Sequence, residues 1–411
     1  MKFGLLGRTL GHSFSPRIHS ALGNTNYELF EREPSQLQEF FADPELQGIN
    51  ITIPYKVNAL EACDVIDPRA ERIGCVNTMV RKNGKWHGYN TDYDGFVFTL
   101  QHVGIDVADK ECIILGDGAS SATVHVALED LGAKNIVHLS RKTAPFYGDA
   151  PNYYETTQII INCTPIGMYP HNPANLIDIT QFSKLEGVVD LIYNPRRTIL
   201  LLQAEMMEIP HCDGLPFLVA QGVEAAKHFQ GESFGTKEIE QILRDMRREK
   251  ENIILIGMPG VGKTTVGKAL GEEMGRTCVD VDQELEKEIG DISTYITEQG
   301  EDAFREKEAE MIAKLGTQTG LVISTGGGCV TVPKNYAHLR QNGRIYQLTQ
   351  PVENLSTTGR VLSSGGLDRL RELEEIRTPM YESFAQCIVE HKRNAPETVA
   401  AILEDFEANL L

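Results

Sequence analysis

Residues 252–274 read NIILIGMPGVGKTTVGKALGEEM, an apolar run followed by a glycine-rich turn and then by a run with helical spacing. From Gly257 to Thr264 the stretch matches G-x-x-x-x-G-K-[ST], a pattern whose backbone N–H groups converge on a nucleotide phosphate. The N-terminus of the next helix adds positive potential there. We expect Lys263 to reach the terminal phosphates and the Thr264 hydroxyl to bind Mg²⁺. A strand, a phosphate loop and a helix in this order predict an α/β domain that uses a nucleotide.

The composition limits the class of protein and the class of partner. The chain has 411 residues, of which 41% are apolar and 24% charged, as in soluble globular proteins of two or three domains. Its net charge is −19, and both parts of the chain, divided after Lys250, are acidic, which argues against nucleic acid or an anionic membrane as a partner. No apolar stretch approaches the ~18 residues of a membrane span, and the first apolar run is too short for a signal peptide. The eight cysteines form no C-x-x-C pair, so no zinc ribbon or disulfide framework is predicted. We therefore expect a cytoplasmic protein with small-molecule substrates.

The order of apolar runs indicates a change of domain near Lys250. Strand-like runs, such as those at residues 2–7 and 112–115, alternate with helical stretches up to about Gly231. This alternation predicts α/β structure with mainly parallel strands. Residues 234–251 then read as a highly charged amphipathic helix, and a new buried strand follows directly. The joint contains no tract rich in proline, glycine or serine, so it is expected to be short and helical.

Charged and glycine-rich motifs follow the phosphate loop in a fixed order. Asp280 and Asp282 lie in the run CVDVD, where we expect a strand that places both carboxylates on one face. Such a pair suits a Mg²⁺ ligand and an acceptor for a hydroxyl proton, although a solvated strand end is the alternative. Three further motifs come later: F-R-x-x-E at residues 304–308, G-G-G at 326–328 and R-x-P-x-Y at 377–381.

This order of motifs resembles shikimate kinase over nearly the whole of residues 250–411. The resemblance implies that Asp280, together with the hydroxyl of the phosphate loop, holds Mg²⁺. It also implies that Asp282 binds ring hydroxyls of the substrate and takes the proton of the attacking one. Arg305 and Arg377 would grip the substrate carboxylate, because a planar guanidinium can pair with both of its oxygens.

The resemblance also implies the residues that contact ATP and close the site. Those that would bind ATP are Gly260, Gly262, Lys263, Thr264, Thr265 and Arg393. Arg393 matches a position against the adenine, with a solvated surface arginine as the alternative. Gly327 and Gly328 would let the substrate approach the backbone closely. In the short glycine-rich lid, Arg360 is the best match for the arginine that contacts the transferring phosphate, and Arg369 is the second choice.

The first part of the chain contains a lysine and a carboxylate suited to ketone reduction. Lys56 ends the strand-like run GINITIPYK, and Asp92 follows in GYNTDYDG. A ketone reduced by hydride must receive a proton on its oxygen, so a lysine positioned by a carboxylate is a plausible acid–base pair. Each residue alone would more often be a surface charge. Polar residues in a glycine-rich turn near the start, Ser13 and Ser15, can both donate to one carboxylate.

The ordered set of these motifs resembles shikimate dehydrogenase over residues 1–245. The resemblance implies that Ser13 and Ser15 bind the substrate carboxylate and that Lys56 and Asp92 carry out proton transfer. The residues that would contact the ring hydroxyls are Thr52, Asn77, Asp92 and Gln221, with Tyr193 nearby.

A second glycine-rich turn predicts a dinucleotide site. Gly116, Gly118, Ala119 and Ser120 follow the apolar run CIIL and precede a helical run, as in a dinucleotide fingerprint. The next strand ends at Ser140-Arg141-Lys142, with two cations where an acidic residue would select NAD. Cations there suit a 2′-phosphate, so NADP(H) is favoured over NAD; a basic turn is the alternative. Residues 144–157 are shorter than the crossover helix common in the family.

These expectations give a fold class and a division into domains. The fold is α/β: an N-terminal α/β substrate domain at residues 1–101, closed by helices at about 222–247, and a Rossmann-like NADP domain at 102–247. A P-loop, nucleoside-monophosphate-kinase-like parallel α/β domain follows at 250–411.

The resemblances imply a bifunctional enzyme of aromatic amino acid (chorismate) biosynthesis. It would reduce 3-dehydroshikimate to shikimate with NADPH and then phosphorylate shikimate with MgATP. The alternatives are a quinate/shikimate dehydrogenase with a kinase of altered specificity, and a ligand-sensing regulator without turnover. The sequence leaves the oligomeric state open.

Overall fold

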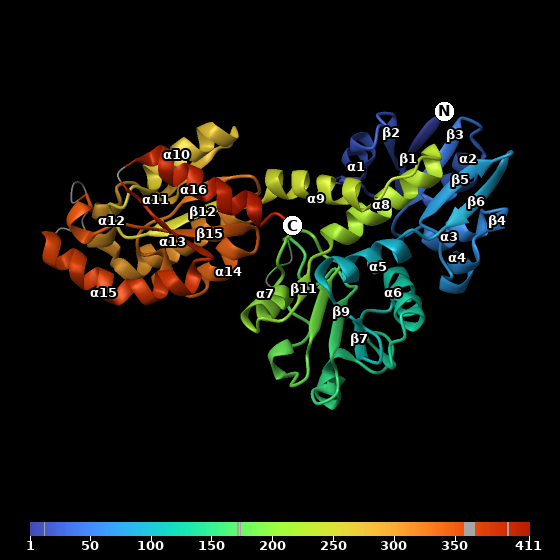
Figure 1. Cartoon of the computed structure of the whole chain (residues 1–411), viewed down its shortest axis with the longest axis horizontal. Helices are drawn as coiled ribbons and strands as arrows, with labels where there is room; N and C mark the ends of the chain where they lie inside the picture. The colour runs from blue at the N-terminus through green and yellow to red at the C-terminus, as the bar shows by residue number, and fades with distance from the viewer. Residues whose placement is uncertain (12, 171, 173, 357–365, 393) are drawn as a thin grey trace. The chain divides into compact units, whose positions relative to one another are not determined.

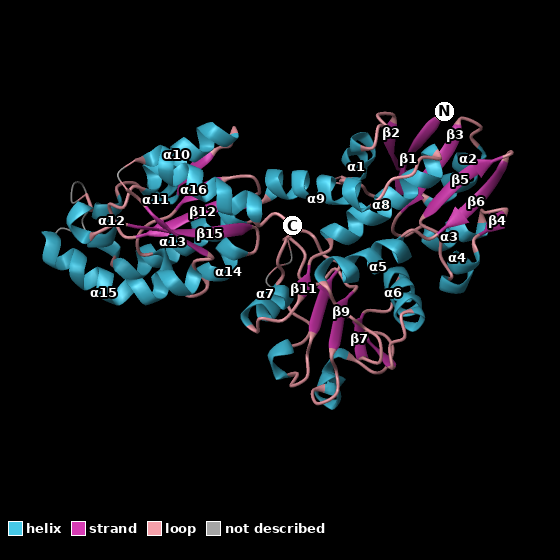
Figure 2. Cartoon of the chain, viewed as in Figure 1, coloured by secondary structure: helices cyan, strands magenta, loops and turns pink. Residues whose placement is uncertain are grey.

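The computed structural model describes the chain except residues 12, 171, 173, 357–365 and 393. It divides into two compact units, Met1–Leu243 and Arg244–Leu411, and the division falls within the charged helix α9 (Thr236–Lys250). Each unit consists of β-sheets covered by helices (Figures 1 and 2). No helix in the described part of the chain is long and apolar enough to cross a membrane.

The first unit begins with a six-stranded sheet in the order β2-β1-β3-β5-β6-β4. Its strands are β1 (Lys2–Gly7), β2 (Tyr27–Glu31), β3 (Leu46–Ile51), β4 (Val65–Ile66), β5 (Thr78–Lys82) and β6 (Lys85–Tyr89). The expectation of mainly parallel strands is wrong for the centre of this sheet, because β5 runs antiparallel to both β3 and β6. Asn83 and Gly84, with φ of 51° and 78°, form the two-residue turn that joins β5 to β6. An Asn-Gly pair favours such a hairpin because both residues tolerate positive φ.

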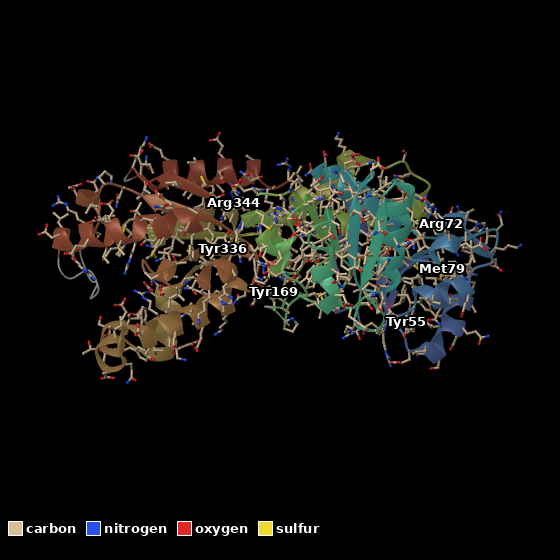
Figure 3. All side chains as sticks on the ribbon, turned by 90° about the horizontal axis from the view of Figure 1, so that it is seen from below. Tyr55, Arg72, Met79, Tyr169, Tyr336 and Arg344 are labelled. Atoms are coloured by element: carbon tan, nitrogen blue, oxygen red, sulfur yellow. The ribbon has the colours of Figure 1, made fainter. Side chains whose placement is uncertain are left out.

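Helices cover both faces of this sheet. They are α1 (Ser15–Ala21), α2 (Leu37–Ala42), α3 (Lys56–Glu61), α4 (Pro68–Ile73) and, from later in the chain, α8 (Leu215–Gln230). Helices α2, α3 and α4 pack on the face that contains Ile49 and Met79, whereas α8 packs through Phe229 on the other. Tyr55 and Met79, both labelled in Figure 3, are fully buried in this core.

The second sheet of this unit is five-stranded and entirely parallel, in the order β11-β10-β9-β7-β8. Its strands are β7 (Glu111–Leu115), β8 (Asn135–Leu139), β9 (Ile159–Asn162), β10 (Gly187–Asp190) and β11 (His211–Cys212). Helices α5 (Asp92–Val103) and α6 (Ala119–Asp130) cover one face and α7 (Ile199–Met206) the other. A 3-10 helix at Tyr147–Tyr153 stands where a longer crossover helix is expected between β8 and β9. The central strands are apolar throughout because both faces are covered.

The second unit is built on one five-stranded parallel sheet in the order β13-β14-β12-β15-β16. Its strands are β12 (Asn252–Gly257), β13 (Cys278–Asp280), β14 (Val322–Ser324), β15 (Gly343–Thr349) and β16 (Cys387–Glu390). Its helices are α10 (Lys263–Met274), α11 (Val281–Ile289), α12 (Ile292–Gln299), α13 (Glu301–Gly316), α14 (Asn335–Arg340), α15 (Gly366–Phe384) and α16 (Ala395–Ala408). The phosphate-loop motif joins the central strand β12 to α10, so it lies at the carboxyl edge of the sheet, where ligands of open α/β folds bind.

Two strands end earlier than their sequence patterns predict. The expectation that Lys56 ends a strand is wrong: β3 stops at Ile51, Tyr55 N–H donates to Thr52 O at 2.9 Å, and Lys56 begins α3. Pro54 has no N–H with which to continue a ladder. The expectation that Asp280 and Asp282 share one face of a strand is also wrong. The Asp280 carboxylate accepts from the N–H groups of Asp282 and Gln283, so it caps α11 and places Asp282 in a helix.

The central strand of the second unit provides a test of this architecture. Ile254 is fully buried in β12, so Ile254→Ala should leave a cavity and lower the free energy of unfolding of this unit by about 2–5 kcal/mol. Ile388→Ala is the matched control, because Ile388 is 54% exposed on β16 of the same sheet. Urea unfolding followed by circular dichroism reports on both units, whereas Trp86, the single tryptophan, reports by fluorescence on the first. A shift of the Trp86 transition by Ile254→Ala would contradict the division into units.

Candidate active sites

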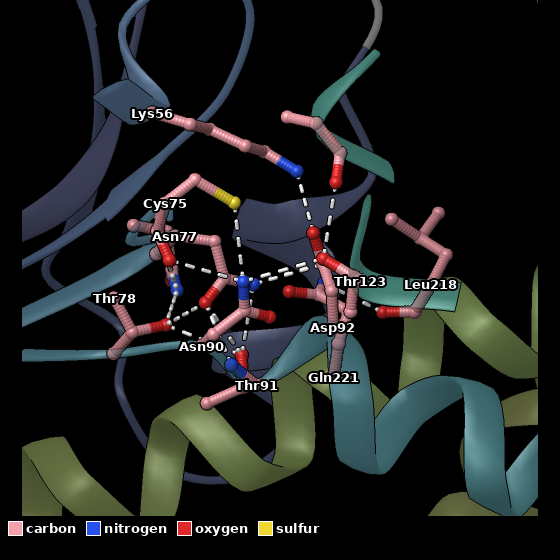
Figure 4. Close-up of polar contacts among 12 residues, drawn as sticks. Lys56, Cys75, Asn77, Thr78, Asn90, Thr91, Asp92, Thr123, Leu218 and Gln221 are labelled. Carbon is pink, nitrogen blue, oxygen red and sulfur yellow. Dashed lines mark hydrogen bonds and ion pairs between the residues drawn. The ribbon is translucent and has the colours of Figure 1, made fainter. Parts of the chain in front are cut away.

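Lys56 and Asp92 form a buried ion pair at the meeting point of two helix N-termini (Figure 4). Lys56 Nζ lies 2.5 Å from Asp92 Oδ2, and the two side chains are 12% and 5% exposed. Burial opposes the charge of Lys56, but the negative charge and the hydrogen bond of Asp92 outweigh it, so the pKa of Lys56 is raised above its usual value. Asp92 begins the 12-residue helix α5, whose N-terminal dipole favours a carboxylate. The pair therefore holds a protonated lysine in place.

Asn77 binds the second oxygen of Asp92. Its Nδ2 donates to Asp92 Oδ1 at 2.8 Å, and its own Oδ1 accepts from Thr91 N–H at 2.7 Å. Gln221 lies on α8, where its Nε2 donates to Leu218 O at 2.8 Å (Figure 4). A side chain at Gly95 would clash with Gln221 and with the backbone of Phe217, so α8 packs directly on the helix that begins with Asp92.

The serine-rich turn lies beside the strand ends of both sheets of the first unit. Ser13 Oγ donates to Ser15 Oγ at 3.2 Å, so the two hydroxyls are neighbours. Phe14, between them, contacts the ring of Tyr193 with a centroid distance of 5.5 Å, which places Tyr193 next to the turn. Thr52 follows β3, and its N–H donates to Leu6 O in β1 at 2.9 Å. The structure thus brings Ser13, Ser15, Thr52 and Tyr193 to the edges where these strands end.

The predicted dinucleotide loop connects β7 to α6 and lies beside a basic turn. Gly116 has a φ of 119°, which a side chain would rarely adopt, and its N–H donates to Leu139 O at 2.9 Å. Gly118 precedes α6, which begins with Ala119 and Ser120. After β8, the Ser140 hydroxyl accepts from the N–H groups of Lys142 and Thr143 at 3.1 and 3.0 Å. Ser140 therefore builds the turn that presents Arg141 and Lys142 to solvent.

The phosphate loop in the second unit places a lysine and two oxygen ligands together. Lys263 is buried, and its Nζ donates to the carbonyl groups of Gly257 and Met258 at 2.8 and 3.1 Å, which points it into the loop. Thr264 Oγ1 donates to Asp280 Oδ2 at 2.6 Å. A hydroxyl and a carboxylate oxygen side by side are the hard donors that Mg²⁺ prefers, so this pair fits the metal.

The triple-glycine turn after β14 gathers the remaining predicted residues of this site. A Cβ at Gly328 would overlap the guanidinium of Arg305, and one at Gly326 would overlap Glu308 and meet Asp282 Oδ1 at 2.9 Å. Arg377 donates to Gly327 O at 3.1 Å. A Cβ at Gly327 would in turn lie 2.8 Å from the ring of Pro259 in the phosphate loop. Asp282, Arg305 and Arg377 therefore surround one turn that packs directly on the phosphate loop.

Glu308 is a member of this site whose role the sequence reasoning did not predict. It is fully buried, and its Oε2 accepts from Arg305 at 2.7 Å. Burial raises its pKa, and the charge of Arg305 counters that effect. The signal was the spacing of F-R-x-x-E, because residues three apart meet on one face of a helix.

Three further arginines were predicted to contribute to the second site. Arg360 and Arg393 lie outside the described residues. Arg369 is on the surface of α15 and forms an ion pair with Glu372 at 2.8 Å, with both side chains about half exposed or more.

Comparisons with known proteins identify the family of each unit. A family model for shikimate kinase matches residues 259–407, and one for the shikimate dehydrogenase substrate binding domain matches residues 5–79. The shikimate dehydrogenase (NADP(+)) of Clostridium perfringens (strain 13 / Type A) is 34% identical over 265 residues, which cover 60% of this chain and 98% of the relative.

Solved structures give the same result for the first unit. A chorismate mutase/shikimate 5-dehydrogenase fusion protein from Clostridium acetobutylicum superposes with a TM-score of 0.56 at 32% identity, over 59% of this chain and 96% of its own. Shikimate 5-dehydrogenase from Thermus thermophilus, solved with NADP(H) and shikimate, gives 0.54 at 27% identity, over 60% and 99%. The chain therefore belongs to the shikimate dehydrogenase family through its first unit and carries a shikimate kinase domain in its second.

Proposed function

We propose that this chain reduces 3-dehydroshikimate to shikimate with NADPH at Lys56 and Asp92, and phosphorylates shikimate with MgATP at the phosphate loop. The observation that carries the proposal is the buried Lys56–Asp92 pair, with Nζ and Oδ2 2.5 Å apart. The same chain has a phosphate loop against which packs a glycine turn surrounded by Asp282, Arg305 and Arg377. The family assignments support both steps of this bifunctional enzyme, so the quinate-specific and sensor alternatives are not favoured.

In the reductase, the protein supplies binding and the proton, and bound NADPH supplies the hydride. Ser13 and Ser15 bind the substrate carboxylate, because neighbouring hydroxyls can donate to one anion. Thr52, Asn77 and Gln221 orient the ring hydroxyls, with Tyr193 at the edge of the pocket. Lys56 donates its proton to the ketone oxygen as negative charge develops there, and Asp92 stabilises the ammonium before the transfer.

The dinucleotide site uses a loop and a basic turn at neighbouring strand ends. Gly116, Gly118, Ala119 and Ser120 hold the pyrophosphate at the N-terminus of α6. Arg141 and Lys142 bind the 2′-phosphate, and Ser140 fixes the turn that carries them. NADP(H) is thereby selected over NAD.

In the kinase, catalysis of phosphoryl transfer depends mainly on the positioning of the substrates and on the stabilisation of charge. Backbone N–H groups at Gly260, Gly262 and Thr265 hold the phosphates, Lys263 neutralises them, and Thr264 and Asp280 hold Mg²⁺. Arg305 and Arg377 hold the shikimate carboxylate, with Gly327 and Gly328 leaving room for the ring. Asp282 accepts the proton of the attacking hydroxyl. We assign Arg360 to the transferring phosphate and Arg393 to the adenine.

The two separate sheets of the first unit support the assignment of different ligands to different segments of the chain. We assign residues 1–101, with the helices of 222–247, to the substrate, 102–247 to NADP(H) and 250–411 to phosphoryl transfer. All eight cysteines are free, as expected for an enzyme of the cytoplasm.

A coupled assay with 3-dehydroshikimate, NADPH and MgATP tests the assignment. Lys56→Ala should lower NADPH oxidation by about 10²–10⁴-fold through loss of the proton donor, while the phosphorylation of added shikimate continues at the wild-type rate. Lys263→Ala should abolish phosphorylation and leave NADPH oxidation unchanged. In each variant the activity that remains shows that the other unit of the chain is intact. Loss of both activities in either variant, or of neither, would contradict the assignment.

Removing the charge of Arg141 tests the choice of dinucleotide. Arg141→Ala should raise KM for NADPH about tenfold, as expected for one charge-assisted contact to a phosphate, and leave KM for NADH unchanged. Lys134→Ala is the control, because Lys134 is an exposed cation directly before the same strand β8, at its opposite end. Equal effects on NADPH and NADH would exclude a role in binding the 2′-phosphate.

A further inference from the structure

A series of buried hydrogen bonds crosses the first sheet from strand to strand and ends at the catalytic pair of Lys56 and Asp92. Its members are Tyr27 on β2, Asn50 on β3, Thr78 on β5 and Asn77 directly before β5. All of them are buried, and Figure 4 shows the half of the series that contains Thr78, Asn77 and Asp92. Asn50 lies in the motif GINITIPYK and Thr78 directly follows Asn77, yet the reaction described above assigns neither of them a task.

The donors in this series all point the same way. The Tyr27 hydroxyl donates to Asn50 Oδ1 at 2.7 Å. His19 Nε2 lies 3.1 Å from the same oxygen. With its oxygen engaged by these two groups, the Asn50 amide must present Nδ2 on its other side, where it donates to Thr78 Oγ1 at 2.9 Å.

Thr78 continues the same direction of donation toward Asn77. Since its oxygen accepts from Asn50, its proton points to Asn77 Oδ1 at 3.1 Å, or to the Thr91 hydroxyl at 3.2 Å. The Thr91 hydroxyl accepts from Asn77 Nδ2 at 3.0 Å and lies 3.3 Å from Asn77 Oδ1, which also accepts from the Thr91 N–H at 2.7 Å. Asn77 Oδ1 is therefore an acceptor, and a flipped amide would turn its NH₂ group toward the donors of Thr78 and Thr91.

The fixed amide has one consequence for the catalytic carboxylate. Asn77 Nδ2 must face Asp92 Oδ1, which it reaches at 2.8 Å, and this leaves Oδ2 to Lys56. A flipped Asn77 would place its carbonyl oxygen against the carboxylate and repel it. The rotation of the Asp92 carboxylate, and with it the position of the Lys56 proton, thus depends on the direction of the hydrogen bonds that Thr78 makes to Asn77.

We propose that Thr78 is a positioning residue of the reductase, whose hydroxyl, together with the Thr91 N–H, holds the Asn77 amide and thereby keeps Asp92 in the orientation that Lys56 requires. This proposal rests on the proposed roles of Lys56 and Asp92. A cooperative chain in a buried environment is sensitive to the loss of a single member, because the remaining groups stay unsatisfied.

The test replaces the hydroxyl by a methyl group of similar size. Thr78→Val should lower the reductase kcat about tenfold with a smaller change in KM, as expected for one buried hydrogen bond in a network. The alkaline limb of the kcat profile should move to lower pH, since a less well-held Asp92 gives Lys56 less support. Thr78→Ser should restore both properties. Tyr27→Phe should shift the profile in the same direction by less.

Two controls separate positioning from packing. Thr99→Val changes another fully buried threonine, whose hydroxyl donates to Gly95 O at 2.8 Å within α5, and should leave the profile unchanged. The fluorescence of Trp86, the single tryptophan, reports on folding of the first unit in each preparation, and the kinase rate shows that the second unit is intact.

Titration of Lys56 Nζ by nuclear magnetic resonance makes the test independent of turnover. A lower pKa in Thr78→Val than in Thr99→Val supports the proposal, even if the wild-type chain proved inactive and the proposed function failed. An unchanged Lys56 titration, or a loss of thermal stability in Thr78→Val with the pH profile intact, would reduce Thr78 to a packing residue and overturn the proposal.

Discussion

Close-range electrostatics is the constraint on which both sites of this protein depend. The chain carries a net charge of −19, yet its proposed ligands, a carboxylated ring, NADPH and ATP, are all anions. The long-range field opposes them, so binding must come from donors within a few ångströms. The structure places such donors near the strand ends of its sheets: hydroxyls at Ser13 and Ser15, and cations at Arg305 and Arg377.

The cations of these sites are held by partners before any ligand arrives. Lys56 pairs with Asp92 and Arg305 with the buried Glu308, while Lys263 donates to carbonyl groups of its own loop. A buried charge without a partner is strongly destabilising, so each acid makes its cation tolerable inside the protein. The same contacts fix the side chains in one geometry, which reduces the entropy lost when substrate binds. The acids therefore serve binding even where they do not contact the ligand.

The sequence could predict which residues meet but not how the backbone brings them together. The chemistry of ketone reduction and the family resemblance paired Lys56 with Asp92, and the second resemblance grouped Asp282 with Arg305 and Arg377. The sequence did not predict that Lys56 begins a helix, since Pro54 ends the strand only in the context of the turn at Thr52. Asp282 was expected in the strand because the alternation of residues 278–282 also fits a strand that ends in a helix cap at Asp280. The proposed positioning role of Thr78 could not be predicted from the sequence, since it depends on a hydrogen bond from Asn50 on the neighbouring strand.

The central claim is that each unit holds the same small acidic ring beside its own phosphorylated cosubstrate. Calorimetric titration of shikimate into the chain saturated with MgADP, without NADP⁺, tests it most directly because neither reaction can turn over. The account predicts two shikimate sites per chain, of which Ser15→Ala weakens one and Arg377→Ala the other. A single site, or two sites weakened together by either variant, would contradict it.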